Sequence, residues 1–286
     1  MHEEADTRMF FHLASFPENS NVVLRTADAD VCIIALGVWS ELPMMKLWME
    51  VGKLSDNTLR FISIHQLHGI LGEQLCKSLM FFHALTGSDF TASFFRKGKV
   101  KPLKILEKAP ETQIIFANMG ETDHISEGKL NGIESFVCSM YGYKKEKSVD
   151  HVRLMIFLKK YKPKKADKDV ISCVKNMEGN QLPPCSRVLH EKIKRANLVC
   201  SRWKSSLFST SPPFNPEESG WLLKDGEYRV LWFVGPVAPK TIDLVSCDES
   251  GSDNTEDDCD EDDGEDCFED DEVDVDEVDD DELDDD

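Results

Sequence analysis

The sequence predicts an α/β protein in which a small parallel sheet is flanked by helices, followed by a mainly helical region with a small β-hairpin and a disordered acidic tail. Three observations in the first forty residues support the sheet. A helical apolar pattern covers residues 3–15, a short apolar run follows at 22–24, and a second helical run occupies 31–39. A short apolar strand between two helices is typical of a buried parallel sheet.

Periodic apolar patterns predict the next elements in chain order. The stretches 46–51 and 59–64 predict two more strands. Leucines spaced four residues apart over 67–79 predict one long helix. Helical patterns continue over 111–142 and 150–160, so the middle of the chain is expected to be mainly helical.

A β-hairpin is predicted near the end of the folded part. The Asp-Gly pair at 225–226 lies between two apolar runs within 222–232, and such a pair favours a type I′ turn. A Pro-Pro break at 183–184 precedes an amphipathic helix over 187–207, and the Lys-rich stretch 159–168 is typical of a linker. The tryptophans of this region are expected to pack a small core: Trp203, Trp221 and Trp232.

Charge divides the chain into two parts. The net charge is −21, but residues 248–286 hold 26 of the 54 acidic residues and no Lys or Arg. The rest of the chain has 28 acids against 33 bases and is therefore mildly basic. Residues 248–286 are too charged to bury a core, so we expect them to be disordered. They could keep the chain soluble, bind a basic protein partner, or lie over a basic segment of this chain.

Composition excludes some classes of protein. The longest apolar run, 31–39, is too short to cross a bilayer, so no membrane partner is expected. Nine cysteines without CxxC spacing predict neither a disulfide framework nor a zinc site. The charged start after Met1 does not resemble a signal peptide. We therefore expect an intracellular location and leave a nuclear one open.

Three short acidic motifs carry the candidate chemistry. They are the pairs Glu4 and Asp6, and Asp28 and Asp30, and the single acid Asp89 after a Gly-Ser pair. Acids at the carboxyl ends of parallel strands face the crevice where ligands bind. Because Mg²⁺ prefers oxygen ligands and paired metal ions can activate water against a phosphodiester, such a grouping predicts a metal-dependent nuclease site.

Each motif alone also has an ordinary structural interpretation. Acids at a helix start are favoured by the helix dipole, and Asp28 or Asp30 would cap the helix that follows. A Gly-Ser-Asp sequence often forms a turn. His65 and His68 lie three residues apart, but no further ligand pattern completes a metal site with them. His83 has no chemical role that the sequence reveals.

The order of the acidic motifs resembles the flap-endonuclease branch of the PIN-like superfamily. That branch has a helix with Glu-x-(Glu/Asp), a strand ending in Asp-x-Asp, and a Gly-x-Asp followed by a basic helix–turn–helix. This chain has Glu4-Ala5-Asp6, Asp28-Ala29-Asp30 and Gly87-Ser88-Asp89 in the same order. The resemblance implies a partial PIN-like fold, structure-selective hydrolysis of phosphodiesters, and Mg²⁺ or Mn²⁺ held by the catalytic acids Glu4, Asp6, Asp28, Asp30 and Asp89.

A basic segment follows the third motif. In the flap-endonuclease branch the matching region grips the duplex backbone, so the resemblance implies nucleic acid, with DNA preferred, as the partner. Closely spaced Lys residues around a glycine could also bring backbone amides near a phosphate. A solvated basic loop is the alternative. The candidate nucleic-acid-binding residues are Arg96, Lys97, Gly98, Lys99, Lys101 and Lys104.

The chain also resembles uncharacterised, multi-copy animal proteins for which an origin in mobile elements is considered. The likeness covers most of 2–247. The flap-endonuclease branch has acid-bearing strands before its Glu-x-Glu helix, and we expect this front part to be missing here. Whether the chain is an enzyme is therefore left open. The alternatives are a non-catalytic protein that binds nucleic acid or protein and is regulated by its acidic tail, and an acidic chaperone-like or chromatin protein.

These expectations divide the chain into three regions. Residues 1–110 would form the partial PIN-like nuclease domain with its basic helix–turn–helix-like segment. Residues 111–247 would form a mainly helical accessory region that ends in the hairpin, and 248–286 would be the disordered tail.

Overall fold

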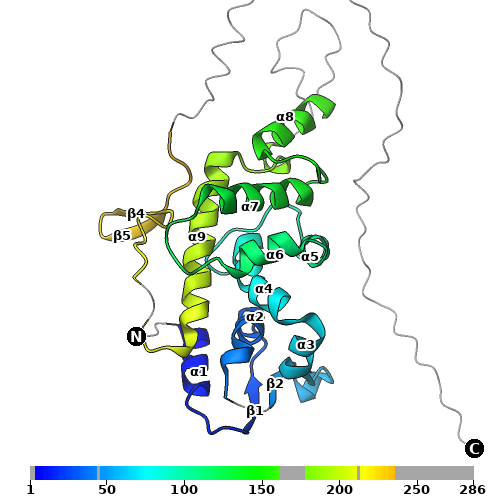
Figure 1. Ribbon diagram of the computed structural model, residues 1–286, viewed down its shortest axis with the longest axis vertical. Helices are drawn as coiled ribbons and strands as arrows, with labels where there is room; N and C mark the ends of the chain where they lie inside the picture. Colours follow the sequence, from blue (N-terminus) through cyan, green and yellow to red (C-terminus); the bar gives the residue numbers. More distant parts are fainter. Residues whose placement is uncertain (1–3, 44–45, 161–177, 211–212, 236–286) are drawn as a thin grey trace, which may run out of the picture. The chain divides into compact units, whose positions relative to one another are not determined.

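The computed structural model describes residues 4–43, 46–160, 178–210 and 213–235, which belong to a unit that ends at Gly235 (Figure 1). The predicted acidic tail and most of the predicted Lys-rich linker lie outside the described residues. Helices and two small sheets make up this unit, so the mixed α/β class is confirmed.

The first 63 residues build a three-stranded sheet with helices beside it. Its elements are α1 (Ala5–Leu13), β1 (Asn21–Arg25), α2 (Ala29–Val38), β2 (Lys46–Val51) and β3 (Arg60–Ser63). β1 pairs with β2 in parallel, with Val22 opposite Leu47. β2 pairs with β3 in the antiparallel sense, with Met49 opposite Ile62. The predicted strands are confirmed, but the expected parallel sheet is mixed, because β3 runs against its neighbour.

The sheet buries one face and leaves the other open. Val22, Leu47 and Met49 point into the core, whereas Val23 and Phe61 on the opposite face are half exposed. Alternate residues of a strand point to opposite faces, so the short strands present one apolar face each. The apolar run 22–24, predicted as a buried strand, is therefore buried on one face only.

The central helices pack closely on one another. The predicted single helix over 67–79 is divided into α3 (Ile64–Leu71) and α4 (Glu73–Thr86) by Gly72, whose φ of 82° ends α3. α2 is apolar nearly all round and lies against α4. A Cβ added to Gly37 would lie 2.5 Å from the Met80 side chain, so this glycine permits the close approach.

The second half of the unit adds helices and a hairpin. Its elements are α5 (Val100–Glu107), α6 (Pro110–Ala117), α7 (Glu127–Met140), α8 (Val149–Lys160), α9 (Ser186–Lys204), β4 (Trp221–Lys224) and β5 (Glu227–Val230). The predicted helix over 111–142 is thus two helices with a loop between them. The hairpin prediction is confirmed: Asp225 and Gly226 have φ values of 55° and 82°, as a type I′ turn requires.

α9 joins the C-terminal part of the unit to the N-terminal part (Figure 1). It packs against α2, α4 and α7. The Asn197 side chain accepts a hydrogen bond from the Gly120 N–H at 2.6 Å and donates one to the Thr122 carbonyl at 2.7 Å. The tip of α9 carries Trp203, which belongs to the main core. The expected separate tryptophan core is wrong, because Trp203 is 1% exposed in the main core whereas Trp232 is 59% exposed.

The two tryptophans provide a stability test. Trp203→Ala should lower the free energy of unfolding by about 3–5 kcal/mol, because it leaves a cavity in the core. Trp232→Ala should lower it by less than about 1 kcal/mol, because the ring is already largely exposed. Urea unfolding followed by circular dichroism measures both. Equal losses would contradict the placement of Trp203 in the core.

Candidate carboxylate site

The acids of the three motifs lie at the ends of different elements. Asp6 occupies the first turn of α1, and Asp89 follows the end of α4. Asp28 is the N-cap of α2, where its Oδ1 accepts a hydrogen bond from the Asp30 N–H at 2.9 Å. The Asp28 N–H in turn donates to Thr26 Oγ1 at 3.1 Å. The sequence between β1 and α2 thus fixes both aspartates by local turn chemistry, as predicted for the cap.

Acids of the other two motifs lie near Asp6. Partial burial raises the pKa of Asp6 above its ordinary value of 3.8, and the negative charges of Asp28, Asp30 and Asp89 raise it further. Asp28 and Asp30 belong to one segment of the chain and Asp89 to another, and Asp6 lies in a third. The structure therefore groups four of the five predicted acids around one face.

Glu4, the remaining predicted acid, lies at the start of α1. It is the N-cap residue, and its carbonyl accepts a hydrogen bond from the Arg8 N–H at 3.1 Å. Glu4 has extended backbone angles, with φ of −103° and ψ of 144°, whereas Asp6 belongs to the helix. The two acids of the first motif therefore differ in backbone conformation.

His83 holds Asp30 in place. Its Nε2 lies 2.8 Å from Asp30 Oδ1, and both side chains are buried. The indole of Trp203 lies beside the imidazole, with 6.0 Å between the ring centroids. A buried carboxylate requires a hydrogen-bond donor, so His83 is a structural partner of the acidic face. The sequence signal that could have indicated this role is a polar residue within the apolar run of α4.

Lys99 binds the end of α4. Its Nζ donates to the His83 carbonyl at 3.2 Å, to Thr86 Oγ1 at 3.1 Å and to the Gly87 carbonyl. An ammonium group has three donors, and here all three face acceptors of the protein. Burial lowers the pKa of Lys99 to about 8, while the charge of Asp30 acts in the opposite direction. Lys99 therefore anchors the turn that leads to Asp89, rather than offering a free ammonium to a phosphate.

Lys192 of α9 binds the segment that follows Asp89, a contact the sequence did not indicate. Its Nζ donates to the Ala92 carbonyl and lies 4.6 Å from the centre of the Phe94 ring. Burial lowers the pKa of Lys192 to about 8, and the positive charges of Arg195 and Lys99 lower it further. Because 100 residues separate Lys192 from Ala92, no local pattern predicts this contact.

The other predicted basic residues lie nearer the solvent. Arg96, Lys101 and Lys104 are exposed. Lys97 is half-buried, with its Nζ 4.7 Å from the centre of the Tyr141 ring, and burial followed by the charge of Lys101 lowers its pKa. A Cβ at Gly98 would meet nothing within 4 Å, so its backbone is open to close approach.

The acidic group has a loose arrangement. Within the described residues, no three or more His, Cys, Asp or Glu side chains are placed to hold one metal ion. One oxygen of Asp30 is already engaged by His83. Mg²⁺ needs only one or two carboxylates when it keeps several of its waters. The oxygen donors therefore suit a hydrated hard cation, whereas the arrangement is not that of a compact multi-ligand centre.

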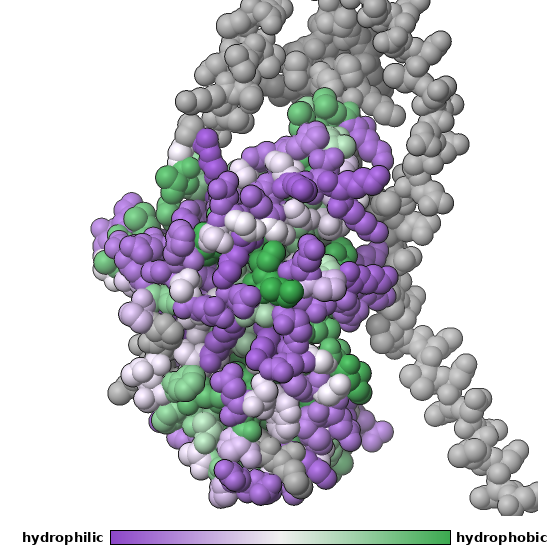
Figure 2. All heavy atoms as spheres, in the orientation of Figure 1, coloured by the Kyte–Doolittle hydropathy of each residue, from purple (hydrophilic) through white to green (hydrophobic). Residues whose placement is uncertain are grey.

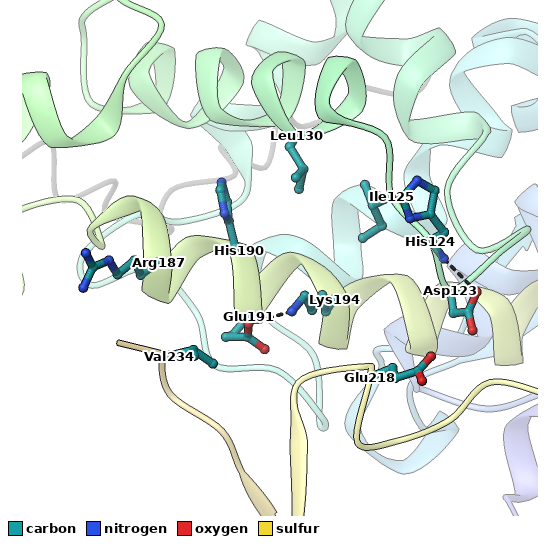
Figure 3. A pocket seen from close by; sticks show the side chains of 10 residues that line it. All are labelled: Asp123, His124, Ile125, Leu130, Arg187, His190, Glu191, Lys194, Glu218 and Val234. Atoms are coloured by element: carbon teal, nitrogen blue, oxygen red, sulfur yellow. Dashed lines mark hydrogen bonds and ion pairs between the residues drawn. The ribbon is translucent and has the colours of Figure 1, made fainter. Parts of the chain in front are cut away.

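A separate hollow of about 420 Å³ lies along α9 (Figure 3). His190 and Leu130 extend into it from α9 and α7, and Lys194 donates to Glu191 Oε1 at 2.7 Å. Its lining mixes acids, bases and apolar groups and includes none of the predicted site acids. We therefore treat it as distinct from the carboxylate face.

The pKa of Asp6 offers a direct test of convergence. Because its pKa is raised in the folded state, the stability contributed by its protonation is present below pH 3.8 and is lost as the pH rises through the folded pKa. Asp89→Asn removes one of the charges that raise this pKa, so the pKa of Asp6 should fall. NMR titration of the Asp6 carboxyl measures the change, and Asp56→Asn is the control. An unchanged Asp6 pKa in Asp89→Asn would contradict the grouping.

The buried pair offers a second test. His83→Ala leaves the Asp30 carboxylate without its donor and should lower the free energy of unfolding by about 1–3 kcal/mol. The double variant His83→Ala with Asp30→Ala should lose less than the sum of the single losses, with a coupling of about 0.5–3 kcal/mol. Urea unfolding of all four proteins measures the coupling. Strictly additive losses would mean that the two side chains do not depend on each other.

Comparison with known proteins does not place the chain in a family. No family model, no curated protein and no solved structure matches it. Among the described residues no helix is long and apolar enough to cross a membrane.

Proposed function

We propose that this protein is a divalent-cation-dependent, structure-selective nuclease of the flap-endonuclease-like kind, acting on DNA at the face formed by Asp6, Asp28, Asp30 and Asp89. The proposal is carried by the placement of Asp28, Asp30 and Asp89 near Asp6, close enough for their negative charges to raise its pKa. The PIN-like assignment of the fold and the use of Mg²⁺ or Mn²⁺ belong to the same proposal.

A group of like charges favours a cationic ligand. Carboxylates that approach one another repel, and burial adds to the cost of keeping them ionised. A divalent cation between them would relieve this repulsion. When bound, it would supply the ability to activate water and to stabilise the charge that develops on a phosphodiester. The acids of the chain would hold and orient it.

The surrounding residues support this role by fixing the acids. Asp28 is fixed as the N-cap of α2 by the hydrogen bond that it accepts from the Asp30 N–H, and His83 fixes the Asp30 side chain. Lys99 and Lys192 bind carbonyls on both sides of Asp89. Sites that act on charged substrates need acids with defined positions, and these contacts restrict the movement of each segment.

A non-catalytic nucleic-acid-binding protein of the same ancestry is the second candidate. The loose arrangement of the acids and the engagement of Asp30 by His83 favour it. Such a protein would keep the basic segment and its affinity for phosphates while cleaving nothing. A regulatory role of the acidic tail, a basic protein partner and an intracellular or nuclear location stay predictions from the sequence.

Cleavage assays separate the two candidates. The full chain is incubated with flap, bubble and single-stranded DNA and with Mg²⁺ or Mn²⁺. Asp28→Asn, which keeps a capping side chain, and Asp89→Asn should each lower the cleavage rate by about 100-fold or more. Asp56→Asn removes the same charge outside the site and should leave the rate unchanged.

The outcomes are distinct. Equal cleavage by the wild type and by Asp28→Asn or Asp89→Asn would show that these acids do no catalysis and would reject the nuclease proposal. Binding of the same substrates without cleavage under any of these cations would favour the second candidate. Addition of EDTA should stop cleavage by the wild type and leave binding intact.

A further inference from the structure

Two basic segments that are distant in the sequence lie side by side. One is the predicted segment 96–104, and the other is the turn after α7, residues 141–147, with the sequence Tyr-Gly-Tyr-Lys-Lys-Glu-Lys. The two meet where Lys97 Nζ lies 4.7 Å from the centre of the Tyr141 ring, and α5 packs against α7. We call the following residues the paired basic surface: Arg96, Lys97, Lys101, Lys104, Lys144, Lys145 and Lys147.

The paired basic surface is accessible and strongly positive. Lys144, Lys145 and Lys147 are all exposed. Acids in or next to these segments include Glu107 at the end of α5, Glu146 in the turn and Asp150 in the first turn of α8. Glu146 Oε2 lies 2.9 Å from His151 Nδ1, and the Asp150 carboxylate accepts hydrogen bonds from Ser186. Figure 2 shows mostly hydrophilic side chains where α5 and the end of α7 reach the surface, at the right of the view. Bases therefore dominate this part of the molecule.

We propose that the turn 144–147 is a second contact for the phosphate backbone of a nucleic acid, next to the segment 96–104. Lys side chains on two separate segments can each neutralise phosphates along one strand or on two strands. The inference rests on the proposed function for its ligand. It requires no cleavage and no divalent cation, because backbone binding depends on cationic side chains.

Two neighbouring features favour a nucleic acid over an acidic protein segment. The Phe95 ring is 38% exposed, and the Arg96 guanidinium lies 5.3 Å from its centre, an arrangement on which a base can stack. The open space at Gly98 allows a phosphate to reach the backbone. An acidic peptide would use the positive charge but has no nucleobase to stack on the ring.

The test compares two variants with the same change in net charge. One carries Lys144→Gln, Lys145→Gln and Lys147→Gln. The control carries Lys46→Gln, Lys53→Gln and Lys224→Gln, three exposed lysines on or beside β2 and β4. The full-length proteins bind a short labelled DNA duplex, and the same strand unpaired, in EDTA, with anisotropy followed over a range of salt concentrations. Thermal melting checks that each variant folds.

The turn variant should lose roughly ten-fold in affinity for the duplex near 0.1 M salt, and the slope of log affinity against log salt should shrink by about 2 to 3. The control should change little in either quantity. Equal losses in both variants, or no binding by the wild type, would overturn the inference. The inference would also be overturned if the turn variant kept the wild-type affinity for both DNAs but bound an acidic peptide with the sequence of residues 248–286 less tightly than the wild type does.

This result is independent of the cleavage assay. A turn variant that binds weakly, in a protein whose wild type cleaves nothing, supports the second contact and rejects the nuclease. A turn variant with wild-type affinity, in a protein whose cleavage depends on Asp28 and Asp89, supports the nuclease and rejects the second contact.

Discussion

The buried hydrogen bond between His83 and Asp30 is the interaction on which the arrangement of the acidic face depends. It joins the start of α2 to the end of α4, and the indole of Trp203 in α9 lies beside the His83 imidazole. A carboxylate in this position without a donor would be unfavourable, so the packing of three helices and the position of one site acid are set together. Core and site cannot be altered separately here.

α9 extends the same constraint to distant loops. Its buried polar side chains bind backbone groups: Lys192 the Ala92 carbonyl, Arg195 the Gly220 and Leu231 carbonyls, and Asn197 Gly120 and Thr122. Buried cations are costly unless they find acceptors, and these acceptors lie in segments that have no regular structure of their own. α9 therefore holds loops from both halves of the unit, including the segment that follows Asp89.

Sequence patterns predicted the features that depend on residues close together in the chain. The cap at Asp28, the strands β1 and β2, and the turn at Asp225 depend on neighbouring residues, so the sequence was sufficient. The break at Gly72 was missed, because the leucine spacing continues across it. The roles of His83, Lys99 and Lys192 were missed because their hydrogen-bond partners lie 12 to 100 residues away in the sequence. The order of the acids predicted their convergence, but not which acid would be buried.

One short segment of the chain connects the acidic face to the basic segment 96–104, so the two would act together. Residues 89–99 begin at Asp89 and include Lys97, which contacts Tyr141. Lys99, at the end of this segment, binds the Gly87 carbonyl just after α4. A phosphate backbone is repelled by unscreened carboxylates and attracted by lysines, so binding near the acids requires the basic residues to supply the affinity. A divalent cation would reverse the sign of the acidic face locally. Affinity should then depend mainly on salt and the basic segments, whereas any chemistry would depend on the cation and the aspartates.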